Sequence, residues 1–212
     1  MTDSDGDGVP DACDPEPMDQ MTPDHAVMYH FPTDITEFTV AGTDVVHNVN
    51  SIEIGNEANT ENDSLITNAA WQRAYVEVGF QIFDVGTGLP DKNYEELEVF
   101  TGLGSTMAEL RGFGCTIERQ YQDNTNVKVI VENSSGGPIN EVSDAVPLEQ
   151  SVGVIRVIQT DTIDCTVSRT SNGTPSMLGV AGGTGTIANH VGVYATQLRA
   201  EISYIFIAGV SK

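Results

Sequence analysis

From about residue 25 to the C-terminus, the chain consists of short segments in which apolar and polar residues alternate with a period of two. This period is typical of a β-strand that buries one of its faces. The clearest example is "AYVEVGFQIF", where the apolar face is made of Val76, Val78, Phe80 and Ile82. The same alternation predicts four further buried faces: Val127, Val129 and Val131; Ile163, Cys165 and Val167; Phe113, Cys115 and Ile117; and Ala200, Ile202, Tyr204 and Phe206.

Weaker alternation predicts six more strands, at residues 37–40, 44–48, 51–54, 97–101, 152–159 and 190–195. The segments "SSGGP", "SNGTP" and "AGGTGT" between strands have the composition of turns and loops. About eleven strands with almost no helical periodicity favour an all-β fold. We therefore expect a two-sheet antiparallel sandwich of the jelly-roll kind.

Two of the three cysteines, Cys115 and Cys165, fall on predicted buried faces of strands. Inward cysteines in one sandwich core can form a disulfide, which an oxidising compartment favours. They can equally remain buried thiols that act as small apolar side chains. The alternation leaves both possibilities open.

Charge is unevenly distributed along the chain, whose formal net charge is -22. Residues 1–72 contain 15 Asp and Glu residues, and the first basic residue is Arg73. Such a surface repels nucleic acids and anionic membranes and attracts divalent cations.

We expect no membrane insertion, because no apolar run approaches the roughly 20 residues of a membrane-spanning helix. No signal-peptide pattern follows Met1, so we expect that a secretion signal, if the protein has one, is not in this sequence.

The most specific motif is "DSDGDGVPDACD", at residues 3–14. Its acidic residues recur at the positions that supply oxygen ligands in calcium-binding loops, and Gly8 stands where such loops turn sharply. We expect calcium ligands from five side chains and one backbone carbonyl: Asp3, Asp5, Asp7, Asp11 and Asp14 through their carboxylates, and Val9 through its carbonyl. Asp14 replaces the usual last Glu, and Pro10 does not suit a flanking helix, so the loop differs from a helix-flanked calcium hand.

The motif resembles the thrombospondin type 3 repeat, a calcium-binding segment without regular secondary structure. This resemblance implies an extracellular or cell-surface location rich in calcium. In that family the cysteine pairs with one in a neighbouring repeat, and Cys13 has no such neighbour here. We expect two parts: residues 1–24, the acidic calcium loop and linker, and residues 25–212, the β-sandwich domain.

The strand pattern of the second part resembles the concanavalin A-like (laminin-G-like) jelly rolls, in particular through the closing segment "NHVGVYATQLRAEISYIFIAG". That superfamily contains glycan binders, glycosidases and structural domains. Its retaining enzymes carry a motif of the form E-x-D-x-x-E, and "YEELEVF" does not match it. Glu96 and Glu98 share one strand face and Glu95 lies on the other, so an outward polar face is expected there and no enzyme.

Other constellations give no specific site. The four histidines, His25, His30, His47 and His190, lack the spacing of a zinc site. Trp71 precedes a strand and is expected in the core. Polar residues at 59–63 and 123–126 and Asn172 fall in expected loops and are candidates for ligand binding that the sequence does not rank.

Three functions remain. The first is a secreted or surface-bound, non-enzymatic adhesion module with lectin-like binding to a glycan or another extracellular matrix or surface component. The second is a structural subunit of a surface appendage or filament, assembled from copies of itself through calcium-stabilised contacts, which the unpaired Cys13 and the acidic arm favour. The third, a polysaccharide-degrading enzyme, is disfavoured by the failed motif.

Calcium should bind residues 3–14. Calorimetric titration of the full chain at millimolar calcium should show a binding event that is lost in Asp5→Ala/Asp7→Ala, because two ligands are removed. The absence of calcium uptake at these concentrations would contradict the assignment.

Overall fold

The computed structural model describes residues 25–31, 35–58, 62–86, 94–103, 110–120, 126–133, 138–160, 162–182 and 190–211. The calcium motif and Cys13 lie outside these ranges. All regular secondary structure within them is β-strand, and they contain no helix long and apolar enough to cross a membrane. The strands are β1 (His25–His30), β2 (Phe38–Ala41), β3 (Val45–His47), β4 (Ile52–Ile54), β5 (Asp63–Val85), β6 (Tyr94–Leu103), β7 (Leu110–Gln120), β8 (Val127–Asn133), β9 (Pro138–Asp144), β10 (Ser151–Gln159), β11 (Ile163–Ser171), β12 (Thr174–Gly182), β13 (His190–Thr196) and β14 (Leu198–Ser211).

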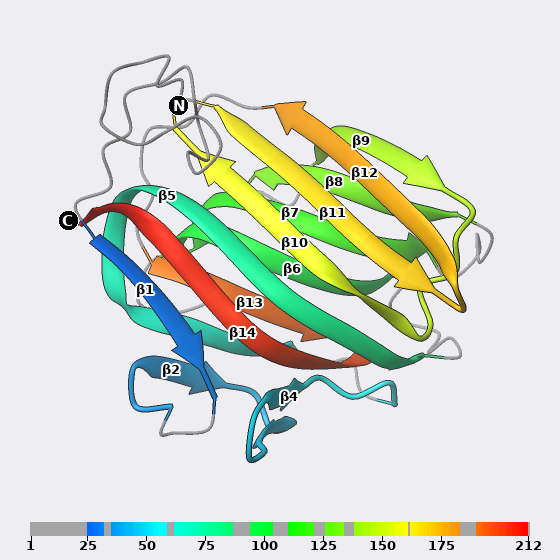
Figure 1. The fold of residues 1–212 in the computed structure, drawn as a ribbon, viewed down its shortest axis with the longest axis horizontal. Coiled ribbons are helices and arrows are strands. Elements are labelled where there is room, and N and C mark those ends of the chain that lie inside the picture. The colour runs from blue at the N-terminus through cyan, green and yellow to red at the C-terminus, as the bar shows by residue number, and fades with distance from the viewer. Residues whose placement is uncertain are drawn as a thin grey trace, which may run out of the picture.

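The strands form two antiparallel sheets that pack face to face (Figure 1). Sheet A has the order β12-β11-β10-β5-β14, and both β1 and the β4-β3 pair lie along β14. Sheet B has the order β9-β8-β7-β6-β13-β5-β2. The predicted all-β sandwich is confirmed.

Strand β5 belongs to both sheets. Its first part, residues 63–70, pairs with β13 and β2 in sheet B. Its second part pairs with β10 and β14 in sheet A. Figure 1 shows β5 curving from one layer into the other at one end of the sandwich. Trp71 lies between the two parts with 1% of its surface exposed, so its predicted place in the core is confirmed.

One continuous apolar core fills the space between the sheets. The faces predicted on β5, β8 and β11 lie in it, as do Cys115 and Ile117 of β7. Phe113 is partly buried and packs against this core. Strict alternation therefore identified the inner faces of four strands correctly.

The face predicted for β14 is wrong beyond Ile202. Ala200 and Ile202 are fully buried, but the pairing register with β5 shifts between Ile202 and Tyr204. Such a β-bulge inserts one residue and exchanges the two faces of the strand that follows. Ile205 and Ile207 consequently enter the core, while Tyr204 and Phe206 lie on the outer face of sheet A.

Three strands were missed: β1, β9 and β12. The segment "SNGTP" provides the turn between β11 and β12, with Asn172 and Gly173 at positive φ angles of 49° and 79°. Asparagine followed by glycine suits a two-residue hairpin, because both tolerate the left-handed region. The turn prediction therefore holds, although the strand that follows it has too weak an alternation to be recognised.

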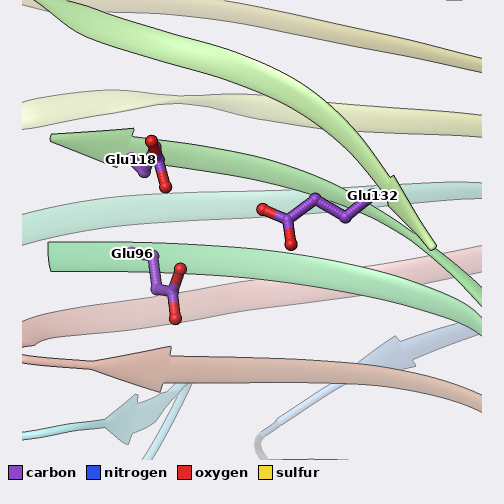
Figure 2. Close-up of side chains that lie close together, drawn as sticks. All are labelled: Glu96, Glu118 and Glu132. Carbon is purple, nitrogen blue, oxygen red and sulfur yellow. The ribbon is translucent and has the colours of Figure 1, made fainter. Parts of the chain in front are cut away.

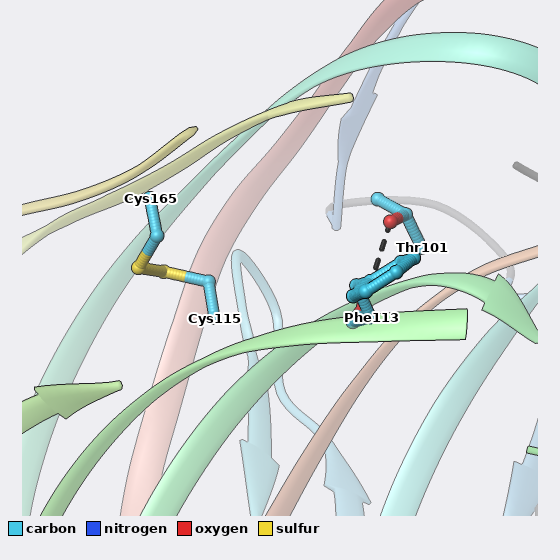
Figure 3. Close-up of a disulfide and its surroundings, with 4 residues drawn as sticks. All are labelled: Thr101, Phe113, Cys115 and Cys165. Carbon is cyan, nitrogen blue, oxygen red and sulfur yellow. Dashed lines mark hydrogen bonds between the residues drawn. A yellow bond between two sulfur atoms is a disulfide. The ribbon is translucent and has the colours of Figure 1, made fainter. Parts of the chain in front are cut away.

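A disulfide joins the two sheets through the core. It links Cys115 of β7 in sheet B to Cys165 of β11 in sheet A, with a Cα–Cα distance of 5.5 Å (Figure 3). Of the two possibilities left open by the sequence, the structure has the disulfide. Figure 3 also shows Thr101 of β6, which donates a hydrogen bond to the carbonyl of Phe113, its partner in the β6-β7 ladder.

Two arginines form hydrogen-bonded ion pairs with carboxylates at the margins of the core. Arg119 of β7 donates two hydrogen bonds to the fully buried Glu95, with N–O distances of 2.9 and 3.1 Å, and a third to Glu149. Arg169 of β11 binds Asp144 and the carbonyl of Val146, both at 2.7 Å. These charged groups are tolerated because each is paired and hydrogen-bonded.

Removing the disulfide should destabilise the sandwich. The bridge closes a loop with a sequence separation of 50, so Cys115→Ala/Cys165→Ala should lower the free energy of unfolding by about 3–4 kcal/mol. Guanidinium denaturation under oxidising conditions measures this change. Cys13→Ala is the control and should leave the midpoint unchanged; an equal midpoint in the double variant would contradict the structural role.

Candidate functional site

The outer face of sheet B carries the candidate site. On β6 and β7 the core residues Leu97, Val99, Cys115 and Ile117 alternate with residues that point away from the core. The outward residues of the central strands are Tyr94, Glu96, Glu98 and Phe100 of β6; Gly114, Thr116 and Glu118 of β7; Lys128, Ile130 and Glu132 of β8; and Tyr194 of β13.

Three glutamates on neighbouring strands converge on this face, and we call them the acidic cluster: Glu96, Glu118 and Glu132. Glu96 lies directly opposite Glu118 in the β6-β7 ladder, and Glu132 reaches the same place from β8. One carboxylate oxygen from each lies within 4.8 Å of those from the other two (Figure 2). Like charges directly opposite one another destabilise a ladder, so this arrangement has an energetic cost.

Glu98 lies beside the acidic cluster and is folded down onto the sheet. A Cβ atom added at Gly114 would fall 1.4 Å from Oε1 of Glu98, so the carboxyl occupies the place that a side chain on β7 would fill. Glu98 is only 4% exposed. The glycine at position 114 therefore permits the buried position of this carboxyl.

An apolar group borders the acidic residues. Phe100 and Tyr194 stack with ring centroids 5.2 Å apart, and Ile66 of β5 completes a buried group separate from the main core. The Tyr194 hydroxyl donates a hydrogen bond to Glu96. At the other end of the outward row of β6, Tyr94 is 42% exposed.

Burial and mutual repulsion raise the pKa values of these carboxyls. Burial, and then the charges of Glu132 and Glu96, raise the pKa of Glu98 well above its usual range. Burial, and then the same two glutamates, raise the pKa of Glu118 to about 7. Burial also raises the pKa of Glu132, and the Thr116 hydroxyl offsets part of that rise.

Positive charge near the acidic cluster is limited to Lys128 among the described outward residues of β6, β7 and β8. Lys128 is opposite Glu118 in the β7-β8 ladder, but its amino group binds Glu141 of β9 at 3.1 Å. The Glu141 carboxylate raises the pKa of Lys128. The cluster therefore retains a net negative charge.

The residues predicted from the sequence are placed as follows. Glu96 and Glu98 share the outer face and Glu95 points inward, as expected. No histidine joins a group of potential metal ligands in the part of the chain that the structure describes. Among the loop candidates, Asn172 lies in an exposed hairpin turn, and most of residues 59–63 and 123–126 fall outside the described ranges.

Glu118 and Glu132 were missed as functional candidates. Their outward orientation was implicit in the alternation, because Ile117 and Val131 were expected inside. What the sequence lacked was the pairing of β6 with β7 and of β7 with β8, which brings the three glutamates together.

Known structures share the fold, although a scan against protein-family models and a search of curated proteins give no match. The exoplasmic/lumenal domain of VIP36, in a Ca²⁺/Man3GlcNAc-bound form, aligns with a TM-score of 0.61 and 9% identity over 88% of each chain. A prokaryotic β-1,3-1,4-glucanase (lichenase) derived from a mouse hindgut metagenome aligns with a TM-score of 0.59 and 9% identity, over 87% of this chain and 99% of that one. The carbohydrate-binding module CBM66 from Bacillus subtilis gives 0.54 and 10% identity, over 79% and 92%.

The fold is a legume-lectin-like, concanavalin A-like jelly roll. At these identities the likeness shows the fold alone. The same fold occurs in glucanases and other glycoside hydrolases as well as in lectins. The exclusion of an enzyme is therefore wrong: it relied on the absence of one motif within a strand, whereas glycoside hydrolases share this fold.

Stability should depend on pH through Glu118. The pKa of Glu118 is about 7 in the folded protein and about 4.3 in the unfolded chain. Between these two pH values the folded state binds a proton that the unfolded state has already released. The free energy of unfolding therefore falls as the pH rises from about 4.3 to about 7. With EDTA present, Glu118→Gln should raise the free energy of unfolding by about 1–3 kcal/mol at pH 8 and have little effect near pH 4.5.

Urea denaturation at the two pH values measures this difference. The neighbouring charges that raise the pKa are those of Glu96, Glu132 and Glu141, and Lys128 lowers it. Glu201→Gln, on β14 of sheet A, is the matched control and should show no such pH dependence. Equal effects of Glu118→Gln at pH 8 and pH 4.5 would contradict the shift.

Proposed function

We propose that this protein is a carbohydrate-binding β-sandwich that holds a glycan on the outer face of sheet B. The observation that carries the proposal is the outward row of β6, where the exposed ring of Tyr94 is in line with Glu96 and Glu98. Aromatic rings pack against the apolar faces of sugars, and carboxylates accept hydrogen bonds from sugar hydroxyls. Both kinds of group are needed for a sugar site.

The fold supports this proposal, because lectins and a carbohydrate-binding module share it. An extracellular or secretory location is part of the proposal. It is supported by the disulfide between Cys115 and Cys165, since disulfides persist in oxidising compartments. The calcium motif of residues 3–14 fits the same location and remains a prediction.

Hydrolysis of a glycan is a second candidate function. Retaining glycosidases place two carboxyl groups about 5–5.5 Å apart across the scissile bond. Glu96, Glu118 and Glu132 each place one carboxylate oxygen within 4.8 Å of the other two, so this face brings carboxyl groups together as such a mechanism requires. Release of reducing ends from a polysaccharide panel tests this candidate, and turnover should be lost in Glu132→Gln.

Glycan binding should depend on Tyr94 and on Gly114. On a glycan array followed by calorimetry, Tyr94→Ala should weaken binding about three- to tenfold through loss of ring contact, whereas Tyr94→Phe should retain it. Gly114→Ala should abolish binding, because the new methyl group displaces Glu98.

The control for the glycine is Gly179→Ala on β12 of sheet A, where an added Cβ would be 3.7 Å from its nearest neighbour. This variant should bind as the unchanged protein does. Binding that survives both Tyr94→Ala and Gly114→Ala would place the glycan elsewhere and overturn the proposal.

A further inference from the structure

We propose that the acidic cluster binds a hard divalent cation of the calcium class, with one carboxylate oxygen from each of Glu96, Glu118 and Glu132 and the hydroxyl of Thr116. This site is separate from the predicted loop at residues 3–14. It does not depend on glycan binding.

The three carboxylate oxygens have the spacing of a coordination shell. Three atoms that are at most 4.8 Å apart share a point within about 2.8 Å of all of them, and calcium–oxygen distances are 2.3–2.6 Å. Small rotations of the glutamate side chains are therefore sufficient to close the shell. The three come from three adjacent strands whose backbone spacing is fixed by the β6-β7 and β7-β8 ladders.

Thr116 is an independent indication of a ligand. It lies on the same outward face of β7, directly opposite Glu98 and two residues from Glu118. Its side chain is fully buried, and its Oγ1 atom has no hydrogen-bond partner of normal geometry. The hydroxyl nevertheless faces the carboxyls of Glu98 and Glu132 closely enough to lower the pKa of each. A buried hydroxyl without a partner costs about 1–3 kcal/mol, and a cation in the cluster would satisfy it.

The donor atoms select the class of ion. All four are oxygens, which favours hard cations such as calcium and magnesium over zinc or copper. Magnesium requires a nearly ideal octahedron at 2.0–2.1 Å, whereas calcium accepts irregular shells. Long glutamate side chains on a twisted sheet give an irregular shell, so calcium is the better fit.

The negative charge around the acidic cluster also favours a bound cation. Glu98 lies next to the cluster, and the nearby Lys128 already pairs with Glu141. A divalent cation would neutralise the repulsion among these carboxylates, whereas Arg119, Arg156, Arg169 and Arg199 bind other carboxylates.

The test uses the full chain with the N-terminal loop disabled, Asp5→Ala/Asp7→Ala, titrated calorimetrically with calcium chloride at pH 8. We expect residual binding to one site. Adding Glu118→Gln should weaken it at least about tenfold. Glu201→Gln, which removes one charge from sheet A, should not change it.

The variant Thr116→Val distinguishes a role of the hydroxyl in calcium binding from a role in the stability of the fold. Because Oγ1 has no hydrogen-bond partner of normal geometry, this substitution should not lower the thermal midpoint measured in EDTA, but it should weaken calcium binding about tenfold. The absence of residual calcium binding up to about 5 mM, which is about five times the weakest dissociation constant of extracellular modules (about 1 mM), would overturn the proposal. So would binding that Glu118→Gln and Thr116→Val both leave unchanged. Glycan binding measured in EDTA is a separate result that tests only the proposed function.

Discussion

The architecture depends on one strand that is shared by both sheets. Strand β5 has 23 residues, whereas strands usually have about 5–6, and it pairs with β13 and β2 in sheet B before it pairs with β10 and β14 in sheet A. The two sheets therefore cannot shift relative to each other without breaking its ladders. The buried Trp71 fills the junction, and the disulfide between Cys115 and Cys165 fixes the sheets a second time, several strands away.

A sheet held in this way fixes the side chains on its outer face. Neighbouring residues in an antiparallel ladder have Cα atoms about 4.5–5.5 Å apart. Glu96 and Glu118 are such neighbours, and they cannot separate without loss of backbone hydrogen bonds or core packing. Only a change of rotamer, a bound proton or a bound cation can relieve their repulsion. The raised pKa of Glu118 follows from this constraint together with its burial.

The sequence predicted what depends on local alternation and missed what depends on pairing. The inner faces of β5, β8 and β11 follow from period-two patterns, and so does the outward direction of Glu96. The exchange of faces at Tyr204 does not, because a bulge is set by the partner strand and leaves no regular signal in the alternation. The convergence of Glu118 and Glu132 with Glu96 was missed for the same reason, since strand order is not visible in a single sequence.

Two adjacent carboxylates of β6, Glu95 and Glu96, have opposite surroundings. Glu95 points inward and receives two hydrogen bonds from Arg119, whereas Glu96 points outward toward two other glutamates. Glu77 of β5 is likewise compensated, by Arg156 and two tyrosines. Glu95 and Glu77 are thus each paired with an arginine, and Glu95 belongs to the same strand, β6, as Glu96 of the acidic cluster. Glu118 and the neighbouring Glu98 instead have raised pKa values because of burial and the nearby glutamates, and perturbed carboxyls of this kind are characteristic of functional sites. Three glutamates held together on one rigid face form a surface whose oxygen atoms suit partners that carry positive charge or hydroxyl groups.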